Sequence, residues 1–274
     1  MDTTRAESFG CYGHEEDTTP FLDSLAEQGV KIDRCVSQSN WTLPSHAALM
    51  SGKYPSEIGC MTRNSKFEFE KPLSKVLSEK GYSTIGITNV GFLHPQFGFD
   101  RGFDYYRNIT ELVPFEKGDV WKELKQEEWG STKEKYGYFL TDRLKALDLK
   151  ELANGAYYLL RNKLNFGDQG AKETNREARQ QLKTHEEPFF LFLNYIEPHS
   201  PYRPPREWRK KFEGISRKEA IQLEDYDELA VLSGEGEMTS ENMDRIQTLY
   251  DSEIAYMDSK IQGLYYWLQE TGRI

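Results

Sequence analysis

Apolar residues recur along the chain with two different periods, and each period predicts one kind of element. Spacings of three and four residues predict helices over residues 17–29, 72–80 and 240–271. Each of these helices ends at or beside a glycine, the residue that most readily closes a helix: Gly29, Gly81 and Gly272. The longest carries its apolar positions at Met243, Ile246, Leu249, Ile254, Met257, Ile261, Leu264 and Leu268.

Other segments have the patterns of strands. Residues 30–39 alternate between apolar and polar, and residues 82–88 are rich in β-branched side chains. Residues 188–199 begin with a continuous apolar run and end in polar groups, which is typical of a buried parallel strand with functional groups at its carboxyl end. Between them we expect a turn over residues 41–44 and a short helix over residues 45–51, ended by Gly52. The alternation of strands and helices predicts an α/β domain with a mainly parallel sheet.

The character of the chain changes between about residues 111 and 185. This stretch is charged and aromatic, and parts of it have helical periodicity. We interpret it as a helical insertion or lid within one domain that spans residues 1–274, and not as a second domain.

The composition of the chain limits the classes of protein to which it could belong. Of the 274 residues, 37% are hydrophobic and 29% charged, as in globular proteins, and no apolar run approaches the ~20 residues of a membrane span. The net charge of −10 argues against nonspecific binding to nucleic acid. No signal peptide is visible at the start, and the compartment stays open. Three scattered cysteines, Cys11, Cys35 and Cys60, predict neither a disulfide framework nor a zinc site.

Three clusters contain residues able to do chemistry. Asp2 stands where a strand would end, a natural place for a ligand of a divalent cation. Thr42 precedes a helix start, where free N–H groups attract anions, so its hydroxyl is a candidate nucleophile. Read alone, Thr42 and Ser45 are more often plain helix caps, His46 is more often structural than catalytic, and a histidine at a strand end such as His199 often only hydrogen-bonds a neighbouring backbone group.

Taken together, a series of motifs in chain order resembles the sulfatase family of the alkaline phosphatase superfamily. They are D-T-x-R-A-x-x-x-G-C-Y-G at 2–13, T-P-x-L-D-x-L-A-x-x-G at 19–29, the nucleophile segment at 42–52, G-Y-x-T at 81–84, R-G-F-D at 101–104, F-L-x-x-E-P-H-x-P-Y around His199, and Y-D-x-E-I-x-Y-x-D at 250–258. The resemblance covers most of the chain outside residues 111–185.

The resemblance implies an alkaline-phosphatase-like α/β fold and metal-dependent hydrolysis of sulfuric esters. It implies that Asp2 and Thr42 bind a divalent metal, which by analogy with the family is Ca²⁺, and that Thr42 is the nucleophile. His46 stands where the family has an arginine that steadies the nucleophile. Ser45 and His199 would contact the substrate, and His199 would also assist the leaving oxygen. The ligand would be a sulfated or phosphorylated small molecule or glycan.

The sequence departs from the family pattern at the nucleophile. Typical members have Cys or Ser, which is oxidised to formylglycine, and threonine cannot form that aldehyde. An ester on Thr42 would have to be released by water. Phosphate and phosphonate esters therefore become stronger candidates as substrates. The G-K-W-H segment of many members is also missing, since Thr88-Asn89-Val90-Gly91 stands there.

Both ends of the chain also depart from the family. The chain begins at the first metal ligand, without the preceding strand, and stops before the S-D-H-G or S-D-N-G segment that supplies further metal ligands. We therefore expect an incomplete, N-terminal part of a sulfatase-like domain with little activity by itself.

Three hypotheses remain open on these residues. The first is a sulfatase-like ester hydrolase. The second is a transferase that moves a phospho-headgroup with a threonine nucleophile. The third is a sulfatase-like module that binds a glycan or partner without catalysis.

Overall fold

The structure is a computed structural model that describes residues 1–111, 153, 167–212, 214–223, 233 and 238–274. The chain divides into two compact units, Met1–Thr110 with Gly167–Ile274 and, separately, Glu111–Phe166. The second unit lies almost wholly outside the described residues, so the fold below is that of the first. Most of the insertion predicted for residues 111–185 lies there too.

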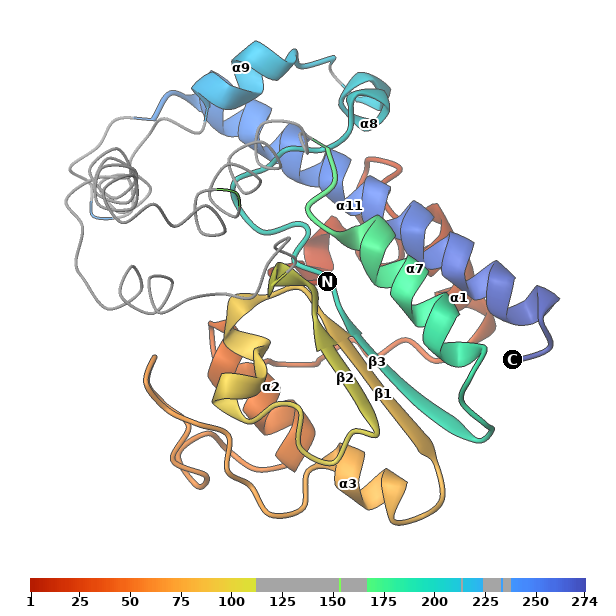
Figure 1. Cartoon of the computed structure of the whole chain (residues 1–274). Coiled ribbons are helices and arrows are strands. Elements are labelled where there is room, and N and C mark those ends of the chain that lie inside the picture. Colours follow the sequence, from red (N-terminus) through yellow and green to blue (C-terminus); the bar gives the residue numbers. More distant parts are fainter. Residues whose placement is uncertain (112–152, 154–166, 213, 224–232, 234–237) are drawn as a thin grey trace. The chain divides into compact units, whose positions relative to one another are not determined.

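A parallel three-stranded sheet forms the centre of the first unit (Figure 1). Its strands are β1 (Ser83–Thr88), β2 (Tyr105–Asn108) and β3 (Phe189–Asn194), in the order β2-β1-β3. The register aligns Thr88, the last residue of β1, with the last residues of both neighbours, Asn108 and Asn194. The strands predicted within residues 82–88 and 188–199 are confirmed, and so is the parallel α/β sheet. Three polar residues therefore end the strands side by side.

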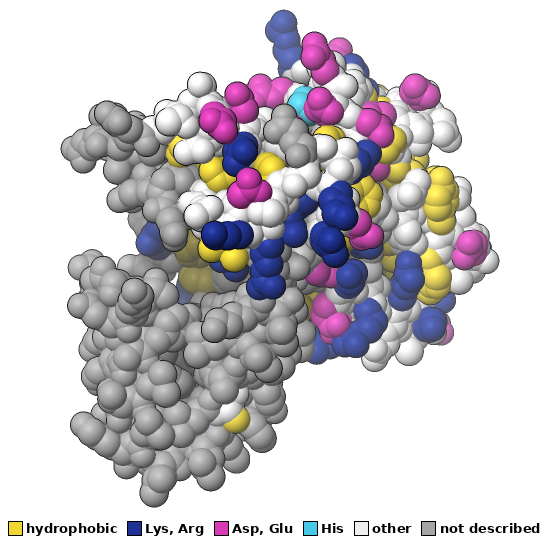
Figure 2. Space-filling model, turned by 90° about the horizontal axis from the view of Figure 1, so that it is seen from above, with side chains coloured by type: hydrophobic (Ala, Val, Ile, Leu, Met, Phe, Trp, Pro, Cys, Tyr) yellow, Lys and Arg dark blue, Asp and Glu magenta, His cyan; other side chains and the backbone are white. Residues whose placement is uncertain are grey.

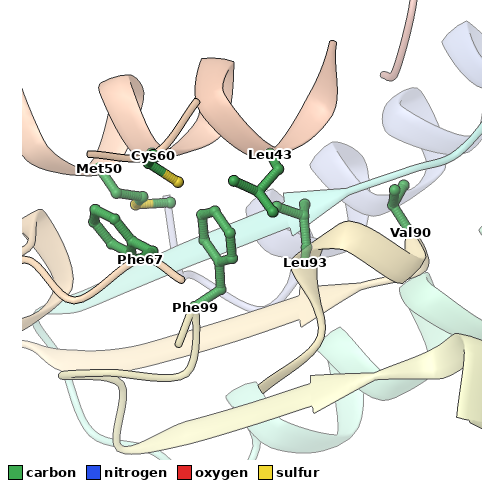
Figure 3. Packing of buried hydrophobic residues seen from close by; sticks show 8 residues of the cluster. Leu43, Met50, Cys60, Phe67, Val90, Leu93 and Phe99 are labelled. Carbon is green, nitrogen blue, oxygen red and sulfur yellow. The ribbon is translucent and has the colours of Figure 1, made fainter. Parts of the chain in front are cut away.

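One face of the sheet is covered by α2 (Thr42–Ser51) and α3 (Leu73–Ser78). The apolar face of α2 meets the segments around β1 in a buried cluster, part of which Figure 3 shows. The rings of Phe67 and Phe99 stack there with centroids 5.1 Å apart. Full burial of a large apolar side chain contributes about 1.5–3 kcal/mol, so this cluster fixes α2 firmly to the sheet.

The other face carries α7 (Ala171–Leu182) and the long helix α11 (Ser240–Glu270), with α1 (Pro20–Gln28) against α11. Tyr195, Tyr256 and Met257 are buried in the cluster on this face. The helices predicted for residues 17–29, 72–80 and 240–271 are confirmed with shorter ends. Gly272 has the left-handed φ of +67° expected of a residue that closes a helix.

Shorter elements connect these layers. In the described part of the chain between β3 and α11 lie the short helices α8 (Arg206–Lys211) and α9 (Arg217–Gln222). Single turns of 3₁₀-helix lie at Ala6–Ser8, Gly10–Tyr12, Gly91–Leu93, Pro95–Phe97 and Ile109–Glu111. Among the described helices, none has the length and apolar character that a membrane span requires.

The strand predicted for residues 30–39 is wrong. This segment is irregular, and Val30, Ile32 and Val36 are 92%, 61% and 78% exposed. Alternation indicates a strand with one buried face, but it cannot supply the neighbouring strand that the backbone must pair with. In the described part of the chain no strand pairs with this segment, so its apolar side chains stay in solvent.

A buried carboxylate joins two helices that are far apart in the sequence. Asp258 of α11 accepts hydrogen bonds from the backbone N–H groups of Phe21 and Leu22, at 3.0 and 2.9 Å. These N–H groups belong to the first turn of α1 and have no partner inside the helix. A side chain from α11 therefore caps α1.

Replacing this cap should weaken the fold. We expect Asp258→Ala to lower the free energy of unfolding by about 1–2 kcal/mol, because two buried donors lose their acceptor. Urea unfolding followed by circular dichroism measures it, with Asp244→Ala, an exposed aspartate of the same helix, as the matched control. Equal stability of the two variants would contradict the capping role.

Candidate active site

The first residue of α2 is Thr42, one of the candidate site residues. Trp41 precedes it in an extended conformation and packs edge-on against Phe92, with ring centroids 5.4 Å apart. Leu43 and Ala47 are fully buried, so packing fixes the start of α2 and Thr42 with it. The helix begins three residues earlier than the sequence predicted. Pro44 lies inside the helix and not in the predicted turn, since proline fits the first helical turn, where no partner is needed for its missing N–H.

The carboxylate of Asp2 meets the hydroxyl of Thr42. Thr42 Oγ1 donates a hydrogen bond to Asp2 Oδ2 at 3.2 Å. The backbone N–H of Asp2 donates to the carbonyl of Tyr195 at 2.8 Å, just beyond β3, and Asp2 is only 8% exposed. Figure 1 shows the N-terminus at the carboxyl ends of the strands. A buried carboxylate next to a hydroxyl at a helix N-terminus can accept the proton of that hydroxyl.

His46 lies one helical turn after Thr42, and both its ring nitrogens have partners. Nδ1 lies 2.8 Å from the Thr42 carbonyl oxygen, and Nε2 lies 3.2 Å from Asn194 Nδ2 at the end of β3. The carbonyl can only accept, so Nδ1 carries the proton and Nε2 accepts from the amide. Burial lowers the pKa of His46, opposed by the Thr42 carbonyl and the charge of Asp2. A neutral His46 therefore ties the start of α2 to the sheet.

Ser45 has a local partner as well. Its hydroxyl donates to the Thr42 carbonyl at 3.0 Å and lies 3.4 Å from His46 Nδ1. It does not serve as the N-cap of α2, because Trp41 occupies that position.

The loop after β3 brings His199 to the same end of the sheet. Thr3 Oγ1 donates to the Pro198 carbonyl at 2.9 Å, which ties the loop to the residue after Asp2. The His199 ring is exposed, and its Nδ1 lies 2.7 Å from the Ser200 carbonyl. Among the described residues no hydrogen bond joins His199 to Asp2, Thr42 or His46. Asp2, Thr42, Ser45 and His46 thus form one connected cluster, and His199 stands on a loop attached to it.

Comparison with known proteins decides the family. The family profile described as Sulfatase matches residues 1–273. This chain belongs to the sulfatase family. The resemblance in its motifs is confirmed, and members of this family are hydrolases of sulfuric esters.

The similarity to individual sulfatases covers only part of the length of those relatives. Iduronate 2-sulfatase of Mus musculus is 24% identical over 209 residues, which are 75% of this chain and 35% of the relative. The chain thus spans about a third of that relative.

Two solved structures share the fold at low identity. One is BT4656 in complex with its substrate D-glucosamine-2-N,6-O-disulfate, with a TM-score of 0.57 and 15% identity over 97% of this chain and 60% of that one. The other is the C-terminal periplasmic domain of EcEptC from Escherichia coli in complex with Zn, with a TM-score of 0.50 and 16% identity over 96% and 56%.

Several residues that hold this candidate site were not singled out from the sequence. Asn194 contacts His46, and the Asn89 side chain accepts the backbone N–H of Ile196. The Tyr250 hydroxyl donates to the Thr3 carbonyl and accepts from the Arg5 N–H, both at 2.9 Å. Asn89 and Asn194 stand where apolar strands end, a signal that could have marked them. Tyr250 lies on α11 and carries no such signal.

The described residues of this sulfatase-family chain do not complete a metal site. Asp2 and Thr42 offer two neighbouring oxygen atoms, whereas Ca²⁺ takes six to eight. Within the described ranges, no group of three or more His, Cys, Asp or Glu side chains could hold an ion.

Two buried glutamates stand behind the His199 loop. Glu197 accepts the backbone N–H of Gln169 at 2.8 Å, just before α7, and Glu253 of α11 accepts that of Arg203 at 2.6 Å. The second carboxylate oxygen of each is buried and has no hydrogen-bond partner in the described part of the chain. Burial raises the pKa of both, and the negative charge of Glu197 adds to the shift at Glu253.

The pKa shift at His46 predicts its titration. We expect imidazole NMR to show His46 as the neutral Nδ1–H tautomer, with a titration midpoint below the ordinary value of about 6.5. His46→Gln assigns the signal by removing it. A midpoint at or above the ordinary value, or the Nε2–H tautomer, would contradict the geometry.

The shift at Glu253 predicts how stability changes with pH. Because its folded pKa lies above the ordinary value, the unfolded chain loses this proton first as pH rises, and stability falls through that window. We expect Glu253→Gln to remove this loss, so that the stability of the variant falls less than that of wild type as pH rises above the ordinary glutamate pKa of about 4.5.

Urea unfolding across this pH range measures the difference in slope. The buried amide of Glu253→Gln could also lower the free energy of unfolding by the same amount at every pH. Such a loss would shift the plot of unfolding free energy against pH without changing its slope. The matched control is Glu241→Gln, an exposed glutamate at the start of α11. Parallel curves for wild type and Glu253→Gln would refute the raised pKa.

Proposed function

We propose that this sulfatase-family protein hydrolyses sulfuric esters with Thr42 as the nucleophile. The observation that carries the proposal is the hydrogen bond from the Thr42 hydroxyl, at the first residue of α2, to the buried carboxylate of Asp2. A threonine hydroxyl is a weak nucleophile unless a neighbouring group takes its proton. Asp2 is in position to take it.

In the first step Thr42 Oγ1 attacks the sulfur of the ester. The hydroxyl proton passes to Asp2, a bond forms from Oγ1 to sulfur, and the bond from sulfur to the alcohol oxygen breaks. The free N–H groups at the start of α2 favour the anionic sulfuryl group in this place. The product of this step is a sulfate ester on Thr42.

The departing oxygen needs a proton, and His199 is the group proposed to give it. Its Nδ1 is held by the Ser200 carbonyl, which leaves Nε2 for the substrate when the ring is protonated. Water then attacks the sulfur of the Thr42 ester and gives one proton back to His199. A bond forms from the water oxygen to sulfur, the bond from sulfur to Oγ1 breaks, and Asp2 returns its proton to Oγ1, so that hydrogen sulfate leaves and the Thr42 hydroxyl is restored.

The remaining predicted residues would support Thr42. His46 and Ser45 both hydrogen-bond the Thr42 carbonyl and so hold the backbone from which its side chain projects. His46 is therefore proposed as a positioning residue. Ser45 would contact substrate only if its hydroxyl turned away from the Thr42 carbonyl.

A divalent metal remains part of the proposal without a step of its own. Asp2 and Thr42 would be two of its oxygen ligands, and Ca²⁺ was the ion expected from the sequence. Within the described residues no group of three or more His, Cys, Asp or Glu side chains could hold the ion, so we assign no chemistry to it.

A sulfated sugar is the substrate class that the comparisons favour. The solved relative BT4656 is described with D-glucosamine-2-N,6-O-disulfate as its substrate, and the mouse relative is named for iduronate. We propose a sulfated saccharide, free or within a glycan, for this chain.

The threonine itself favours a second candidate, transfer or hydrolysis of a phosphate or phosphonate group. A hydroxyl nucleophile forms a phosphoryl ester as readily as a sulfuryl one, and Thr42 cannot become the formylglycine of typical sulfatases. The substrate tests below therefore include both groups.

Variants at Thr42 test the proposal. The assay uses the protein in the form produced by its native cells. We expect Thr42→Ala to lower the turnover of an aryl sulfate by about a thousandfold or more, because the nucleophile is lost. Thr42→Ser keeps the hydroxyl and should retain activity well above that of Thr42→Ala.

An exposed threonine supplies the control. Thr184→Ala should leave turnover unchanged. Unchanged activity in Thr42→Ala would overturn Thr42 as the nucleophile. Turnover of an aryl phosphate but not an aryl sulfate would favour the second candidate, and no turnover of either by the wild-type protein would favour the non-catalytic hypothesis.

A further inference from the structure

One face of α7 carries a line of positive charge in a protein whose net charge is −10. Lys172, Arg176, Arg179 and Lys183 follow one another at steps of four, three and four residues, which place them on one side of an α-helix. The opposite side of α7 is buried, with Ala171, Ala178 and Leu182 fully enclosed. The basic side chains therefore all point away from the sheet.

This line borders a groove between α7 and α11. The groove has a volume of about 520 Å³, and Lys260 and Gly263 of α11 line its other side. Figure 2 shows Lys and Arg side chains gathered on the right-hand side of the molecule, where Figure 1 places α7 and α11. The volume is in the range of small-molecule and oligosaccharide sites and exceeds what one inorganic anion needs.

The positive charge in the groove is only partly neutralised. Asp168 lies 3.8 Å from Lys172, and Glu173 lies 2.5 Å from Arg176. Within the described residues, none of the other three cations, Arg179, Lys183 and Lys260, forms an ion pair with a carboxylate.

Two of these remaining cations are held in place. Arg179 donates to the carbonyl of Gly263 at 2.7 Å and lies over the ring of Trp267, and its buried Nε has no hydrogen-bond partner among the described residues. Lys260 lies 5.0 Å from the ring centre of Tyr256. Burial lowers the pKa of Lys260, and the charge of Lys172 adds to this. The groove thus holds cations close to one another. Their mutual repulsion is unfavourable, and an anionic ligand bound between them would reduce it.

We propose that this groove binds a sulfated oligosaccharide chain, at a site built from elements other than those that hold Thr42. The sulfated nature of the ligand rests on the proposed function, whereas its negative charge rests on the groove alone. Sulfates along one chain would pair with successive cations of α7 and with Lys260.

The spacing of the cations favours such a chain over nucleic acid. Four cations from Lys172 to Lys183 cover about 16 Å, or about one per 5 Å, at a helical rise of about 1.5 Å per residue. Duplex DNA has one negative charge per about 1.7 Å and would meet the acidic remainder of the surface. A chain with widely spaced sulfates matches the groove better.

Binding measurements separate this site from the candidate active site. The probes are a heparin hexasaccharide, the same hexasaccharide without sulfates, and sodium sulfate, each titrated calorimetrically into the protein. We expect the sulfated hexasaccharide to bind, the desulfated one not to bind, and sodium sulfate to bind much more weakly, because one ion cannot span the cations.

Two triple variants with equal loss of charge locate the binding. Lys172→Gln/Arg176→Gln/Lys183→Gln should raise the Kd of the hexasaccharide about tenfold, since each exposed ion pair contributes a factor of roughly two to five. Lys53→Gln/Lys71→Gln/Lys80→Gln removes three exposed lysines elsewhere and should change the Kd less than about twofold. Arg179 is left intact because it contacts the backbone of α11.

The outcomes distinguish this proposal from the proposed function. Thr42→Ala should bind the hexasaccharide as the wild-type protein does, even though its turnover is lost. An unchanged Kd in the α7 variant, an equal loss in the control variant, or tighter binding of a single-stranded oligonucleotide of equal charge would each overturn the glycan groove. None of these results depends on whether Thr42 is the nucleophile.

Discussion

The hydrogen bond from the Asp2 amide to the Tyr195 carbonyl is the contact on which the candidate site depends. It holds the start of the chain against the end of β3, and so brings the Asp2 carboxylate to the hydroxyl of Thr42. The start of α2 is held separately, by the bond of His46 to Asn194 and by the buried side chains behind it. Nucleophile and carboxylate therefore come from different segments but are fixed to the same strand.

The segment after β3 links this site to the opposite face of the sheet. Thr3 holds the loop at Pro198 on one side, while Glu197 accepts the backbone N–H of Gln169 at the entry to α7 on the other. Glu253 of α11 holds the same loop at Arg203. Burying two carboxylates here is costly, and the raised pKa of each reflects that cost. A loop fixed from three sides keeps His199 at the mouth of the site.

The sequence predicted the elements that have local, periodic signals. The run from Phe189 identified β3, and the spacing of apolar residues identified α11, because both are set by burial along a single element. The strand predicted for residues 30–39 was wrong because the alternation of apolar and polar residues contains no information about a neighbouring strand to pair with.

The contacts of the site were harder to predict than its residues. The motifs pointed to Asp2 and Thr42, and the structure joins them. Asn194 and His46 are 148 residues apart, and Tyr250 and Thr3 are 247 apart, so no local pattern connects them. Such pairs follow from the packing of β3 and α11, which only the folded chain reveals.

The most direct measurement is the mass of the Thr42 peptide after the protein has been mixed with an aryl sulfate and quenched in acid. A nucleophilic Thr42 predicts a peptide heavier by one sulfuryl group, with fragmentation that assigns it to residue 42, and no such peptide from Thr42→Ala. Release of the aryl alcohol by the wild-type protein with the Thr42 peptide unmodified at every quench time, or with the added group on another residue, would contradict the account.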